Sequence, residues 1–87
     1  MPEPRVRAAE IIGKTVISEE NGRKFGIVEN LEFAVETGEL INIILSQPTK
    51  YAREINLRQN DKGKYLIPFV AVKSIGDFVI INETELV

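Results

Sequence analysis

The fold class is decided by the stretch Tyr65-Leu66-Ile67-Pro68-Phe69-Val70-Ala71-Val72-Lys73-Ser74-Ile75-Gly76-Asp77-Phe78-Val79-Ile80-Ile81. Pro68 has no N–H to donate, so it ends a strand or lies at a sheet edge. The four residues after it predict half a turn of helix, and Gly76-Asp77 predicts a turn before a last strand over 77–82. A strand, a corner and a final strand are typical of a small β-barrel. Because such a corner is scaffold, the stretch favours a binding or assembly module over an enzyme.

The rest of the chain carries turn signals about every 10–15 residues, a spacing that predicts a compact all-β barrel. Asn21-Gly22 is a strong hairpin signal because both residue types accept a positive φ. The predicted elements are a helical turn over 8–13, strands over 14–18, 25–35 and 40–45, a loose stretch over 46–53, a strand over 54–58 with Ile55 and Leu57 inward, and a returning strand over 64–67.

Residues 25–35 alternate between apolar and polar side chains, as a half-buried strand does. The alternation assigns one face to Phe25, Ile27, Leu31, Phe33 and Val35. Glu29 falls on that apolar face and Val28 on the polar one. This interruption predicts a bulge near residues 28–30.

Composition excludes several classes of function. The chain has no cysteine and no histidine, which removes thiolate metal sites, disulfides and the commonest neutral-pH base. Its 11 basic and 13 acidic residues give a net charge of −2, whereas a general nucleic-acid binder shows a basic excess. No apolar run is long enough to span a membrane, and the N-terminus lacks the apolar region of a signal peptide. We therefore expect a cytoplasmic protein without cofactor or metal.

The domain organisation that we expect is simple. Residues 1–7 read as a flexible N-terminal arm, residues 8–82 as one barrel domain and residues 83–87 as a C-terminal tail.

The pieces of the pattern resemble the PRC-barrel family in their order and spacing. They are Glu10-Ile11-Ile12-Gly13-Lys14-Thr15-Val16, Gly22 with Gly26-Ile27-Val28, the turn Thr37-Gly38, Ile67-Pro68-Phe69-Val70-Ala71-Val72, and Ser74-Ile75-Gly76-Asp77 with the strand Phe78-Val79-Ile80-Ile81. The resemblance extends from about residue 5 to residue 82, with residues 47–58 outside any family pattern. It implies a small bent β-barrel of about six strands with one short helical turn.

The family has several roles. Members occur in the reaction-centre H subunit, in the ribosome-maturation factor RimM, and as short stand-alone archaeal proteins, some of which bind SepF, the membrane anchor of the tubulin-like FtsZ ring. Because this chain shows no appended RNA domain and no transmembrane segment, the resemblance favours the stand-alone archaeal type. It implies a non-catalytic cell-division adaptor recruited to the inner membrane face through its partner. The alternative is an RNA- or ribosome-associated accessory domain.

A basic stretch is the candidate partner site. Residues 50–65 contain five basic side chains and two tyrosines, and their only acidic residues are Glu54 and Asp61. The expected partner-binding residues are Lys50, Tyr51, Arg53, Arg58 and Lys64. A solvated face, a site for an acidic protein and a site for single-stranded RNA all remain open from the sequence.

Apolar excess favours a homodimer or a pair with a related barrel, with the chain's own short helical turn as the other candidate cover. The strands over 40–45 and 78–82 are apolar on both faces, and a small barrel has only one interior to bury them. The expected interface residues are Ile41, Ile43, Leu45, Val79 and Ile81.

Enzymatic readings find little support in the chain. A nucleophilic serine has no histidine base, and the adjacent Lys73 and Ser74 would point to opposite faces of a strand. Carboxylate pairs such as Glu19 and Glu20 fall in predicted exposed turns, where their pKa values would not separate. We therefore expect no catalytic residues.

Overall fold

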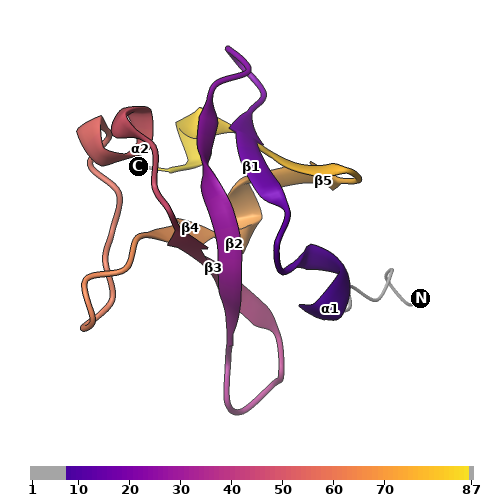
Figure 1. The fold of residues 1–87 in the computed structure, drawn as a ribbon. Coiled ribbons are helices and arrows are strands. Elements are labelled where there is room, and N and C mark those ends of the chain that lie inside the picture. The colour runs from indigo at the N-terminus through magenta and orange to yellow at the C-terminus, as the bar shows by residue number, and fades with distance from the viewer. Residues whose placement is uncertain (1–7, 87) are drawn as a thin grey trace.

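The fold is one curled antiparallel sheet with a single parallel pair, seen in a computed structural model that describes residues 8–86 (Figure 1). The strands are β1 (Thr15–Ser18), β2 (Lys24–Phe33), β3 (Leu40–Ser46), β4 (Leu66–Pro68), β5 (Val72–Ile75) and β6 (Phe78–Ile81). Their order in the sheet is β4-β3-β2-β1-β6-β5, with β1 and β6 parallel. The expected all-β, barrel-like fold of about six strands is confirmed, although the expected arm over 1–7 lies outside the described residues.

The helical elements are all short. They are α1 (Ala8–Ile11), α2 (Lys50–Glu54) and the 3-10 helices η1 (Phe69–Ala71) and η2 (Glu83–Glu85). The predicted helical turn before Gly13 and the half-turn after Pro68 are confirmed as α1 and η1. Pro68 is the last paired residue of β4, opposite Asn42, as its missing N–H predicts. No described helix is long and apolar enough to cross a membrane.

The strand expected over 54–58 is wrong, and the stretch before it is not loose. Thr49 caps α2, because its hydroxyl oxygen accepts a hydrogen bond from the N–H of Ala52 at 3.1 Å. Ala52 and Leu57 are both buried, so this segment reaches the core through a helical turn rather than through a strand. The sequence signal for α2 is Thr49, a good N-cap residue, directly after Pro48. The alternating Ile55 and Leu57 favoured a strand instead.

Register shifts interrupt the pairing of the long strand β2 at three places, one of them between Glu32 and Phe33 near its end. Its register against β3 shifts between Val28 and Asn30, which confirms the predicted bulge. A second shift lies against β1, where Val16 pairs with Gly26 and Ile17 pairs with Lys24. The shifts at residues 24–26 and 28–30 change which side chains face inward, so the core side chains of β2 are Phe25, Val28 and Leu31.

The core lies inside the curl of the sheet. It contains one large buried cluster, to which every strand except β5 contributes, with Ile11 from α1, Ala52 from α2 and Ala71 from η1 at its margins. Leu86 is also buried there, so residues 83–86, which the sequence sets apart as a tail, pack against the domain. Burial of this single cluster is the main stabilising term available to so short a chain.

Candidate protein-binding surfaces

The helix α2 is fixed to the start of β2 by its capping residue. The Thr49 hydroxyl donates to the carbonyl oxygen of Lys24 at 2.6 Å, and the Thr49 N–H donates to the carbonyl oxygen of Phe25 at 3.0 Å. These bonds place the β1–β2 turn beside the basic residues of α2. Arg23 and Lys50, which lie far apart in the sequence, are thereby brought to one end of the molecule.

Tyr51 lies at the centre of this end. Its ring packs edge-on against Phe25, with ring centroids 5.5 Å apart, and the guanidinium carbon of Arg23 lies 5.0 Å from the Tyr51 ring centroid. Its hydroxyl donates to the Glu83 carboxylate at 2.8 Å and accepts from the Asn21 side-chain amide at 3.0 Å. Tyr51 therefore joins α2, the β1–β2 turn and η2, and its ring face is already occupied.

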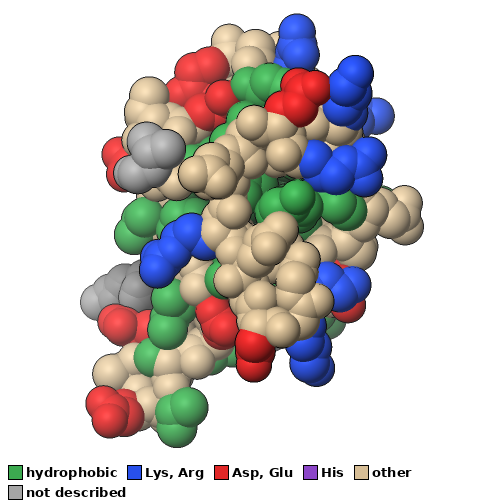
Figure 2. Space-filling view, turned by 90° about the vertical axis from the view of Figure 1, so that its left-hand side faces the viewer, with side chains coloured by type: hydrophobic (Ala, Val, Ile, Leu, Met, Phe, Trp, Pro, Cys, Tyr) green, Lys and Arg blue, Asp and Glu red, His purple; other side chains and the backbone are tan. Residues whose placement is uncertain are grey.

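The predicted basic stretch separates into two parts. We call Arg23, Lys50 and Arg53 the α2 surface, because they surround Tyr51 and its helix; the sequence missed Arg23. Figure 2, which views the side of the molecule that carries α2, shows Lys and Arg side chains gathered along the upper right. Arg53 is exposed and has no ion pair within residues 8–86, while Lys50 approaches Glu54 only at 4.0 Å.

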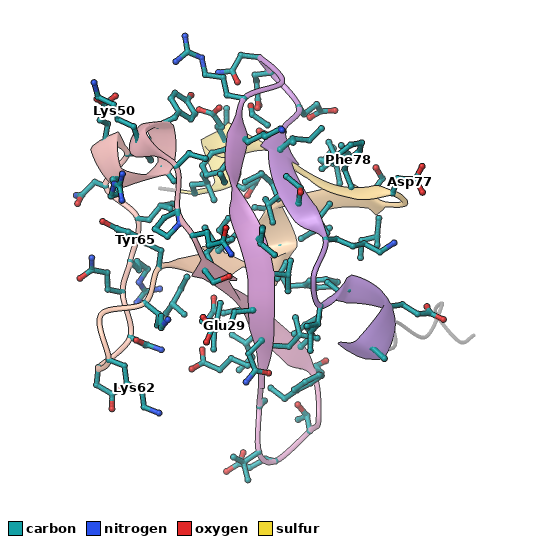
Figure 3. The ribbon with its side chains drawn as sticks, in the orientation of Figure 1. Glu29, Lys50, Lys62, Tyr65, Asp77 and Phe78 are labelled. Atoms are coloured by element: carbon teal, nitrogen blue, oxygen red, sulfur yellow. The ribbon has the colours of Figure 1, made fainter. Side chains whose placement is uncertain are left out.

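The remaining predicted residues lie further along the chain. Figure 3 shows Lys50 and Lys62 at opposite ends of this side, with Tyr65 between them. Lys64 forms an ion pair with Glu29 at 3.1 Å, so its charge is compensated within the chain. Arg58 is exposed, on the segment that follows α2, without an ion pair in the described part of the chain.

Four of the five predicted interface residues belong to the core. Ile43, Leu45, Val79 and Ile81 are 0–1% exposed, so they cannot form a surface patch. Ile41 is 44% exposed, at the start of β3, where a register shift opposite Glu32 and Phe33 turns it outward. The sequence showed correctly that these strands are apolar on both faces, but alternation alone does not say which face is inside.

The other face of these strands is apolar and points away from the core. Across β2, β1 and β6, Thr15 lies between Ile27 and Phe78, and Ile17 lies beside Ile80. We call Ile17, Ile27, Phe78 and Ile80 the outer face. None of these four side chains belongs to the core cluster or packs against it.

The carboxylates near Tyr51 are arranged for structure. Glu20 accepts a hydrogen bond from the N–H of Glu83 at 3.0 Å, and this bond holds the pKa of Glu20 below its ordinary value. A general acid needs a raised pKa, so the shift runs against acid catalysis. Among residues 8–86 no group of three or more Asp, Glu, His or Cys residues is placed to hold a metal ion.

The Tyr51–Glu83 contact gives a testable pH dependence. The hydrogen bond to the Glu83 carboxylate raises the pKa of Tyr51 above its ordinary value of about 10. A raised folded-state pKa contributes stability that is complete below the unfolded-state pKa and is lost as the pH rises through the folded-state value. We therefore expect the contact between α2 and η2 to weaken as the pH rises through the raised pKa of Tyr51.

The measurement is a spectrophotometric titration of tyrosinate in a Tyr65→Phe variant, in which Tyr51 is the only tyrosine. We expect a midpoint above about 10 that falls when Glu83→Gln is added, because the carboxylate charge is then gone. An unchanged midpoint after Glu83→Gln would show that the contact does not set the pKa.

Comparison with known proteins gives one result that bears on this geometry. The family model described as the PRC-barrel domain matches residues 3–87. No curated protein matches the chain.

Proposed function

This chain belongs to the PRC-barrel domain family, and from that premise we propose that it is a non-catalytic adaptor that binds another protein. The observation that carries the proposal is the α2 surface. The hydrogen bonds of Thr49 and the contacts of Tyr51 hold α2 and Arg23 in place, while Arg53, and Arg58 on the segment that follows α2, have no compensating charge in residues 8–86. Fixed, uncompensated charge steers and orients a partner of opposite charge.

The partner class that fits this surface is a protein with exposed acidic residues. Its most specific form, which rests on the family resemblance, is a SepF-like division protein that links the adaptor to the FtsZ ring of an archaeal cell. In this proposal the protein is cytoplasmic and dimeric, and it reaches the membrane only through its partner.

The structure gives less support to RNA as the partner. Single-strand binders present open aromatic faces on which bases stack. The Tyr51 ring is instead packed against Phe25 and Arg23, and the chain as a whole is acidic. We therefore treat RNA association of the ribosome-maturation type as an alternative that the experiment must be able to reveal.

Reversing the charges of Arg53 and Arg58 tests the proposal. We expect Arg53→Glu with Arg58→Glu to weaken partner binding about tenfold or more through lost electrostatic attraction. The free energy of unfolding should change by only about 0.5 kcal/mol per site, because both side chains are exposed. The experiment is affinity capture of the tagged protein from its own cells, with quantitative mass spectrometry and RNA sequencing of the eluate.

The matched control is Lys62→Glu with Lys73→Glu, which makes the same change in net charge at two exposed sites. Lys62 lies at the opposite end of this side from Lys50 (Figure 3), and Lys73 lies on β5. Recovery of a SepF-like protein with the wild type and the control, and its loss with the reversed variant, is the expected result. Enrichment of ribosomal proteins or RNA would replace the proposal with the alternative. Equal capture by all three proteins would show that Arg53 and Arg58 do not contribute to partner binding.

A further inference from the structure

The outer face gathers four apolar side chains around Thr15, of which Ile17, Ile27 and Ile80 are half-buried and Phe78 is exposed. The parallel register of β1 and β6 sets Thr15 beside Phe78 and Ile17 beside Ile80, and the antiparallel register of β1 and β2 sets Thr15 beside Ile27. Side chains in register on neighbouring strands lie on the same face of a sheet and contact one another. Phe78 is 46% exposed.

The α-helices of the described residues do not account for this surface. Ile11 of α1 and Ala52 of α2 are both fully buried in the core, so each helix packs on the inner side of the sheet or at its ends. Sheets in small proteins normally leave polar residues on a solvated face. Apolar side chains gathered on a sheet face that no other element covers form a candidate interaction site.

We propose that a second copy of this chain covers the outer face, packing sheet against sheet around a two-fold axis. This inference rests on the dimeric form of the proposed adaptor and names the surface that forms the dimer. Ile43, Leu45, Val79 and Ile81 have no part in it, because they fill the core of each copy.

The charges at the margins of the outer face match those of a second copy. Lys24 lies at the β2 edge, in register with Ile17, and Asp77 lies at the other edge, directly before Phe78 at the β5–β6 turn (Figure 3). These two positions are diagonally opposite corners of the face. A two-fold axis that lies in the interface plane along the other diagonal exchanges these two corners. Lys24 of each copy then lies over Asp77 of the other copy, so the contact occurs twice per dimer.

Both charges are available for this pairing. Lys24 and Asp77 are exposed, and neither takes part in an ion pair within residues 8–86. Charges at the margin of an apolar interface fix its register and exclude wrong partners. The pairing also separates this surface from the α2 surface, since Lys24 contacts Thr49 only through its backbone carbonyl.

The test is sedimentation velocity of the full 87-residue protein across a concentration series. We expect a concentration-dependent dimer for the wild type and a monomer for Phe78→Asp with an unchanged circular dichroism spectrum. Lys24→Asp and Asp77→Lys should each raise the dimer dissociation constant about tenfold, and the combined charge swap should restore it. Val35→Asp is the matched control, because Val35 is 99% exposed on the β2–β3 loop and should leave the dimer intact.

A wild type that remains monomeric at a protein concentration of about 100 μM, near the weakest dissociation constants of specific interfaces, would overturn the inference. So would a dimer that survives Phe78→Asp, or a charge swap that does not restore association. A monomer whose β1 and β6 amides are protected from hydrogen exchange until residues 1–7 are deleted would assign the face to the chain's own N-terminal segment. Recovery of a related barrel by a monomeric protein would assign it to a heterodimer.

The outcomes separate this inference from the proposed function. A monomer that still captures its partner through Arg53 and Arg58 contradicts only the dimer. A dimer that captures no protein contradicts only the adaptor.

Discussion

Val79→Asp is expected to unfold the domain, whereas Phe78→Asp at the neighbouring position leaves it folded. Val79 is fully buried and pairs with Val16, which is also fully buried. A carboxylate at position 79 would lose its hydration without gaining a partner, which costs at least about 4 kcal/mol. That is most of the stability of a domain of this size.

Phe78 faces away from the core, so a carboxylate there remains solvated. We expect its effect on the free energy of unfolding of the monomer to be about 1 kcal/mol or less. Urea denaturation followed by circular dichroism, at protein concentrations below the dimer dissociation constant, measures both variants. Two variants of equal stability would show that β6 is not oriented as described.

Gly26→Ala is expected to destabilise the protein by about 3 kcal/mol or more. A Cβ at this position would lie 2.9 Å from the carbonyl oxygen of Ser46. It would lie 3.3 Å from both the carbonyl oxygen of Gln47 and the Cα of Pro48. All three atoms belong to the backbone, so no side chain can rotate away, and overpacking of this kind costs about 1–3 kcal/mol. The φ of Gly26, +154°, adds strain of about 1–3 kcal/mol for any residue with a Cβ.

The close approach at Gly26 is what brings the chain from β3 across β2 to α2, and it therefore positions Thr49 and Tyr51. Gly76→Ala is the matched control: a Cβ there meets no atom within 4 Å and the backbone φ is not positive. We expect the control to be neutral or slightly stabilising. Thermal unfolding curves of the two variants that coincide would contradict the packing at Gly26.

Local signals in the sequence predicted the elements whose cause is local. The Asn21-Gly22 and Thr37-Gly38 turns and the corner at Pro68 depend on the φ preferences or hydrogen-bonding limits of single residues. The bulge after Val28 follows from the break in the apolar alternation of residues 25–35. In the first of these turns only Gly22 takes a positive φ, so the turn is not the two-residue type that an Asn-Gly pair favours.

The inner and outer faces of the strands could not be assigned from the sequence. Val79 and Phe78 are both apolar, and alternation gives two equivalent assignments for a strand that is apolar throughout. The choice is made by long-range register, here the pairing of Val79 with Val16. The second register shift in β2, which turns Ile27 outward, lies at Gly26, where the backbone of Ser46 and Pro48 approaches closely.

The candidate site was predicted in part for the same reason. Lys50, Arg53 and Arg58 are exposed, but Lys64 is paired with Glu29, which lies on another strand. Arg23 and Glu83 join Tyr51 only through tertiary contacts across separations of 28 and 32 residues. No local sequence pattern predicts such contacts. An Arg next to a hairpin turn and a Glu near the C-terminus could, however, have been considered as partners of Tyr51.

Titration of the labelled chain with a purified SepF-like protein from the same organism tests whether this protein binds another protein through the α2 surface and Arg58. We expect saturable binding at physiological ionic strength that weakens about tenfold with Arg53→Glu and Arg58→Glu and persists with Lys62→Glu and Lys73→Glu. Absence of saturable binding, or equal affinity for all three proteins, would contradict this expectation.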